Sequence, residues 1–123
     1  MPSMSDPLNR TALQALRETT GDDPEFLAEL VRTFLEDSPG QLDELRSATA
    51  TGNAGDVRRG AHTLRSNAST FGIDSLADVC RELEGRASEG SLDSAEELVT
   101  AIGEALAGAR PALEALADGD RTA

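Results

Sequence analysis

His62 is the only histidine of the 123-residue chain, and its surroundings make it the first candidate for chemistry. With an ordinary pKa of about 6.5, histidine offers a neutral ring nitrogen as a nucleophile near neutral pH. Residues 57–73 contain three arginines and no carboxylate, in a chain with 23 acidic residues. On a helix, the neighbours of His62 in this stretch would be Arg58, Arg59, Arg65, Ser66 and Ser69. Such a patch would attract an anion or an acidic partner site, although a helical histidine beside arginines is more often an ordinary surface residue.

The other reactive residue types do not form a recognisable catalytic or metal site. Cys80 is the only cysteine, which excludes an intramolecular disulfide, and its place in an apolar stripe favours a packed side chain. Glu82 and Glu84 lie two positions apart, so they would face different sides of a helix. We interpret the acidic residues in general as a solvated outer surface. The sequence predicts no metal site and no bound cofactor.

Charge and hydropathy exclude several classes of partner. The net charge of −12 argues against binding to nucleic acid, which requires a basic face, and against an anionic membrane surface. No apolar run approaches a membrane span, and the first residues lack the apolar segment of a signal peptide. Nothing indicates a small-molecule substrate. We therefore expect a soluble, cytoplasmic protein.

The helical spacing of apolar residues, together with the capping and helix-breaking residues between these segments, predicts an all-α fold. A first short helix would be capped by Ser5 or Asp6, with Pro7 in its first turn. A second would run from Pro24 to about residue 49, kinked at Pro39, with a broken pair as the alternative. A turn at 51–55 would lead into a third helix at about 56–70. We predict an antiparallel up-and-down four-helix bundle with this additional short N-terminal helix.

The rest of the pattern predicts the remaining two helices. Gly72 would end the third helix in a left-handed conformation, and Asp74 would cap the fourth. A fifth helix would start near Leu92, with Pro111 kinking or ending it. The expected organisation is a flexible tail at 1–5, one helical domain at 6–117 and a frayed tail at 118–123.

The segment AHTLRSNASTFG at 61–72 resembles the signature of histidine-containing phosphotransfer (HPt) domains. That signature reads Ala-His-x-Leu-Lys-Gly-Ser-Ser/Ala, with a glycine ten residues after the histidine. The likeness continues at Leu76, Cys80, Leu83 and Glu84, which fit the family's Leu-x3-Cys-x2-Leu-Glu, and it spans roughly residues 8–116. Two departures from the signature bear on the site: Arg65 replaces lysine and keeps its charge, whereas Ser66 replaces glycine and bears on access to the imidazole.

The resemblance implies a function for His62. A phosphoryl group would pass from an aspartate of one receiver domain to His62, and then to an aspartate of another. The receivers would belong to a hybrid histidine kinase or a response regulator and would supply the Mg²⁺. Arg65, expected to be solvent-facing, would stabilise the phosphoryl group, and Arg58 and Arg59 would assist or meet the receiver. The chain would be a stoichiometric carrier rather than a turnover enzyme. The alternative is a helical adaptor that binds a partner through the arginine-rich face without being phosphorylated.

Overall fold

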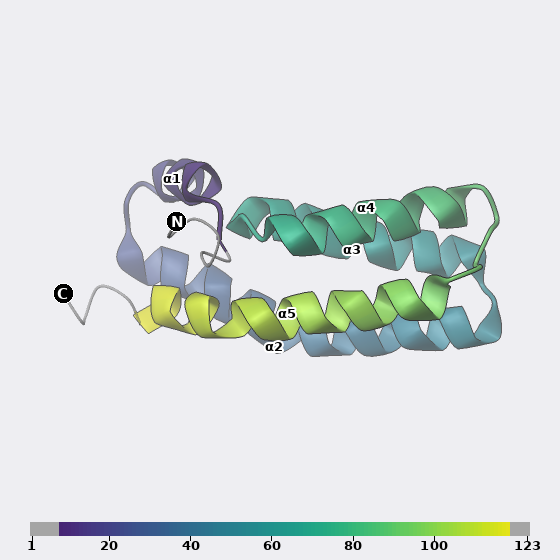
Figure 1. Ribbon diagram of the computed structural model, residues 1–123. Coiled ribbons are helices and arrows are strands. Elements are labelled where there is room, and N and C mark those ends of the chain that lie inside the picture. Colours follow the sequence, from purple (N-terminus) through teal and green to yellow (C-terminus); the bar gives the residue numbers. More distant parts are fainter. Residues whose placement is uncertain (1–7, 119–123) are drawn as a thin grey trace.

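The computed structural model describes residues 8–118, and within this range the chain forms five helices and no strand. The helices are α1 (Arg10–Thr19), α2 (Pro24–Thr51), α3 (Ala54–Phe71), α4 (Asp74–Ser88) and α5 (Ala95–Asp118). Helices α2 to α5 lie side by side along one axis, and the short α1 lies at one end (Figure 1). The all-helical prediction is therefore confirmed. No helix in the described part is long and apolar enough to cross a membrane.

The first helix begins later than its sequence signals indicated. Asn9 caps α1, because its side-chain oxygen accepts a hydrogen bond from the backbone nitrogen of Ala12 at 3.0 Å. Leu8 precedes the helix and is buried. The caps expected at Ser5 or Asp6, and the tail at 1–5, lie outside the described residues. Of the expected tail at 118–123, only Asp118 is described, and it is the last residue of α5.

The second helix is continuous over 28 residues, with Pro39 inside it. This confirms one helix rather than a broken pair. Asp23 caps its start by accepting hydrogen bonds from the backbone nitrogens of the next turn. The expected turn at 51–55 is too long, because Gly52 adopts a left-handed φ of 74° and Asn53 immediately caps α3. Two residues therefore suffice to reverse the chain.

Two further helix starts differ from the sequence prediction. Ile73, not Asp74, is the N-cap of α4, and no side chain makes a capping hydrogen bond there. Asp74 instead accepts a hydrogen bond from the Asn9 side chain at 3.1 Å. Helix α5 begins at Ala95 rather than near Leu92, since Ser94 has a φ of 65°, outside the right-handed helical region. Pro111 does not end α5, which continues for another seven residues.

The buried stripe of α3 fixes the rotation of this helix about its axis. Its members, spaced by four and three as predicted, are all buried: Val57, Ala61, Leu64, Ala68 and Phe71. The Phe71 ring packs against Phe34 of α2 with ring centres 5.1 Å apart. Because these positions point into the core, His62 must lie outside it.

Gly72 joins the α3–α4 turn to the start of α1. Its φ is 74°, and its carbonyl accepts a hydrogen bond from the backbone nitrogen of Asn9 at 2.7 Å. A Cβ at this position would lie 2.8 Å from the Asn9 backbone, closer than ordinary contact. Glycine is therefore required at position 72 for its conformation and for the space it leaves.

We predict that Gly72→Ala destabilises the fold more than Gly52→Ala. Both glycines have a φ of 74°, but a Cβ at Gly52 would meet nothing within 4 Å. Gly52→Ala should therefore cost only the left-handed strain, about 1–2 kcal/mol, and Gly72→Ala should cost more because α1 must also shift. Urea unfolding of both variants measures the difference. Equal losses would show that the Asn9–Gly72 contact is unimportant.

Candidate functional site

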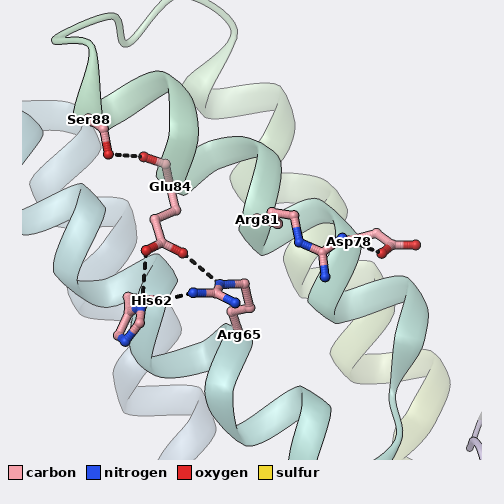
Figure 2. Close-up of polar contacts among 6 residues, drawn as sticks. All are labelled: His62, Arg65, Asp78, Arg81, Glu84 and Ser88. Atoms are coloured by element: carbon pink, nitrogen blue, oxygen red, sulfur yellow. Dashed lines mark hydrogen bonds and ion pairs between the residues drawn. The ribbon is translucent and has the colours of Figure 1, made fainter.

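His62 lies on α3 and projects from the side opposite its buried stripe. Its side chain is 53% exposed. This exposure is expected because the next residue along a helix is rotated by about 100°, which turns position 62 away from the core that buries Ala61. Figure 2 shows the ring beside α4, with Nδ1 turned toward that helix and Nε2 turned away from it. Nδ1 is thus engaged with the protein, whereas Nε2 has no hydrogen-bond partner among residues 8–118.

Glu84 of α4 is the residue that engages the ring. Its Oε2 lies 2.9 Å from Nδ1 of His62, and its side chain is only 18% exposed (Figure 2). Our reading of the acidic residues as a solvated outer surface was wrong for Glu84. The available signal was its place after Leu83 in the second part of the HPt-like pattern, because the buried Leu83 places its neighbour at the edge of the α3–α4 contact.

Arg65 was expected to face solvent, but the structure shows it paired with a residue of α4. Its Nε donates a hydrogen bond to Oε1 of Glu84 at 2.7 Å, and its side chain is 30% exposed. A terminal guanidinium nitrogen also lies 3.2 Å from Nδ1 of His62. Arg65 therefore holds the carboxylate that faces the imidazole and links α3 to α4. Its charge lies on the Nδ1 side of the ring.

The electrostatics of this cluster keep Glu84 ionised. The hydrogen bond from the Arg65 guanidinium lowers the pKa of the Glu84 carboxyl, and the hydrogen bond with His62 acts in the same direction, whereas partial burial opposes them. An ionised carboxylate can only accept hydrogen bonds. The shorter contact, between Nδ1 and Glu84, therefore places the proton of a neutral His62 ring on Nδ1, and the guanidinium nitrogen 3.2 Å away is then a neighbouring donor and not a hydrogen-bond partner. The lone pair that can act as a nucleophile is on Nε2, which is turned away from α4.

The remaining arginines of α3 differ in their partners. Arg59 pairs with Asp56 one turn earlier, whereas Arg58 is exposed and contacts no carboxylate in the described part of the chain. The sequence of residues 57–73 indicated an arginine patch without carboxylates. In the structure two carboxylates reach it, Asp56 from the preceding residue and Glu84 from α4. Among residues 8–118, only Arg58 of the three remains an unpaired cation.

The two candidate serines lie on the exposed face of α3. Neither Ser66 nor Ser69 makes a side-chain hydrogen bond to His62 in the described structure. Ser66 lies one turn beyond His62, and helical side chains lean toward the N-terminus, so its side chain covers surface next to the ring. Their contribution would therefore be to the approach of a partner rather than to the orientation of the imidazole.

Cys80 packs in the core, as its sequence position indicated. It is completely buried, and this burial raises the pKa of its thiol to about 12. A thiol with such a pKa remains protonated near neutral pH, so it does not act as a nucleophile. Within residues 8–118, no three metal-ligating side chains lie together.

The candidate site is therefore a half-exposed imidazole on α3 that is oriented by a carboxylate on a neighbouring helix. Residues 29–118 match the Hpt domain family, so the chain belongs to this family, as the residues around His62 predicted. The phosphorelay protein LuxU of Vibrio vulnificus is 31% identical over 96 residues, covering 77% of this chain and 82% of LuxU. The crystal structure of histidine-containing phosphotransfer protein B (HptB) from Pseudomonas aeruginosa PAO1 is similar with a TM-score of 0.82 and 30% identity, over 91% of this chain and 95% of that one.

We predict that Glu84→Gln lowers the free energy of unfolding at neutral pH. The free energy of unfolding of this variant should also fall less than that of the wild type as the pH is lowered. The folded-state pKa of Glu84 lies below its ordinary value of 4.5, so its contribution is complete above that value and is lost as the pH falls through the folded pKa. The loss at pH 7 should be about 1 kcal/mol or more, because a charged hydrogen bond is removed. Urea unfolding from pH 7 to pH 3 measures it.

Glu82→Gln is the matched control. Glu82 pairs with Arg86 on the same helix, and both side chains are largely exposed. Exposed pairs of this kind contribute only about 0–1 kcal/mol, so the control should follow the wild type at every pH. If the two variants behaved alike, Glu84 would not link the helices energetically.

Proposed function

We propose that His62 is the residue that carries the phosphoryl group in a phosphorelay. The observation that carries this proposal is the contact between Nδ1 of His62 and Glu84, because it leaves a nucleophilic Nε2 on the exposed side of the ring. As an Hpt domain, the chain acts in histidine phosphotransfer. The relative LuxU is itself named a phosphorelay protein, which supports placing this chain in such a pathway.

In the proposed reaction, the lone pair of Nε2 attacks the phosphorus of a receiver's aspartyl phosphate. A P–N bond forms while the P–O bond to the aspartate breaks, and the aspartate leaves as a carboxylate. The proton on Nδ1 stays in place, and the carboxylate of Glu84 balances the positive charge that the ring acquires. Transfer to a second aspartate reverses these steps. The Mg²⁺ that neutralises the phosphoryl oxygens would come with the receiver.

The neighbouring side chains receive distinct roles in this proposal. Arg65 positions Glu84 and adds positive charge beside the ring, and Arg58 is the cation available to the phosphoryl group or to the receiver's acidic rim. Arg59, held by Asp56, would border the docking surface. The small side chains of Ser66 and Ser69 would leave room for the receiver to approach His62. The chain would be used stoichiometrically and act in the cytoplasm.

The fold would serve this role as a rigid support. In the proposal, α2 to α5 form the antiparallel up-and-down four-helix bundle, and α1 is the additional short N-terminal helix. Phosphoryl transfer depends chiefly on positioning and charge stabilisation. The ion pair between Arg65 and Glu84 and the buried stripe of α3 would therefore keep the imidazole still while a partner docks.

The central prediction is that His62→Gln abolishes labelling of the chain. When the wild type is incubated with receiver domains carrying aspartyl phosphate, it should acquire an acid-labile, base-stable phosphoryl group at His62, the only histidine. His62→Gln, with unchanged circular dichroism, should acquire none. Persistent labelling of the variant would refute the proposal. A wild type that binds receivers but is never labelled would favour the adaptor function instead.

A second prediction separates docking from intrinsic reactivity. Ser66→Leu should stay folded, because position 66 is exposed and surface substitutions usually change stability by less than about 0.5 kcal/mol. Its transfer from a receiver should fall at least about tenfold, or 1.4 kcal/mol in the barrier, because the larger side chain obstructs approach to the ring. Labelling by phosphoramidate, a small phosphodonor, should be retained.

Ser75→Leu is the control for this experiment. Ser75 is exposed in the first turn of α4, next to Asp74, which is bonded to the N-cap residue of α1, Asn9. It should transfer at the wild-type rate. Normal transfer by Ser66→Leu would mean that receivers do not approach His62 across this part of α3.

A further inference from the structure

A groove of about 510 Å³ lies between α2 and α3, next to the histidine face. Arg59 and Thr63 form its wall on α3, and these residues lie three positions before and one position after His62. Gly60 lies in the groove, where a Cβ would come within 3.2 Å of the Leu45 side chain. The groove is therefore continuous with the surface that a molecule bound over His62 would cover.

The α2 wall of the groove contains hydrogen-bond acceptors that this chain does not satisfy. The side-chain oxygen of Gln41 is buried and accepts no hydrogen bond from any described residue. Glu44, one turn further along α2, is exposed and has no ion-pair partner among residues 8–118. A buried acceptor without a donor lowers the stability of a fold, so Gln41 is poorly explained by a structural role alone.

The two flanks of His62 are therefore different. On the α4 side, Glu84 and Arg65 already satisfy each other and the imidazole. On the α2 side, Gln41 and Glu44 offer an amide oxygen and a carboxylate without donors. The α2 flank therefore offers acceptors to a partner, whereas the carboxylate on the α4 flank is already paired.

We propose that the α2–α3 groove is a specificity site that receives a basic side chain, lysine or arginine, from the docked receiver domain. This inference rests on the proposed function, because it assumes that a receiver covers His62. The basic group would pair with Glu44 at the groove's edge and donate to Gln41, whose side chain turns outward about its rotatable bonds to accept. Charge complementarity selects this occupant, since both unsatisfied groups are acceptors and one is anionic.

The test uses Gln41→Leu in the full chain, with a receiver domain that phosphorylates the wild type. The variant should be at least as stable as the wild type in urea, because an unsatisfied acceptor is removed. Phosphoramidate should label its His62 normally. In single-turnover transfer, the receiver concentration that gives the half-maximal rate (KM) should rise about tenfold with little change in the maximal rate, because a hydrogen bond to a charged group is lost on docking. Glu44→Gln should raise KM as well, with a weaker dependence on salt.

Each variant has a matched control elsewhere in the chain. Gln14→Leu makes the same chemical change on α1, and Glu36→Gln makes the same charge change on the exposed side of α2. Neither should alter KM. Unchanged KM in Gln41→Leu, or equal effects in the controls, would overturn the groove proposal while leaving His62 as the carrier. If no receiver labels the wild type, the proposed function fails, and the groove proposal fails with it.

Discussion

The carboxylate of Glu84 is the interaction on which the site depends. It accepts hydrogen bonds from two residues of α3 while belonging to α4, so one side chain joins the two helices and orients the imidazole. The Arg65 hydrogen bond keeps this carboxylate charged by lowering its pKa. A charged Glu84 in turn determines which ring nitrogen carries the proton. The Glu84 carboxylate therefore contributes to the stability of the α3–α4 contact, to the orientation of the ring and to the position of the ring proton.

The buried stripe of α3 makes this interaction possible. A helix can rotate about its axis unless its apolar side chains are committed to a core, and five positions of α3 are so committed. With that rotation fixed, residue 62 faces outward and residue 65 reaches α4. The core thus acts on the site through the angular position of a single helix.

The sequence predicted those features that depend on local patterns. The stripe of α3, the left-handed Gly72 and the exposed position of His62 follow from periodicity and from one glycine, and all three are confirmed. The contact between His62 and Glu84 joins residues 22 positions apart, so it depends on how two helices pack and no helical spacing could predict it. Arg65 was misplaced for the same reason, since its partner lies on another helix.

Helix boundaries were predicted less well because several residues competed to be caps. Asn9 and Asn53 cap α1 and α3, whereas the sequence analysis expected a cap at Ser5 or Asp6 and a turn over residues 51–55. Asn53 follows a left-handed Gly52, and that combination reverses the chain in fewer residues than the composition of the turn indicated. Tertiary packing decides between such alternatives, as Asp74 illustrates by bonding to Asn9 instead of capping its own helix.

The contact between α1 and the α3–α4 turn also has a consequence for the order of folding. Asn9 and Asp74 are separated by 65 positions, whereas neighbouring helices along the chain are joined by short connections. Closing so long a loop has a larger entropic cost than pairing successive helices, and beyond a few hydrogen bonds it buries only two apolar side chains among the described residues before α2, Leu8 and Leu16. Helices α2 to α5 should therefore assemble first, and α1 should attach last. By the same reasoning α1 is the element that separates most readily from the folded protein, so native-state hydrogen exchange should be fastest there.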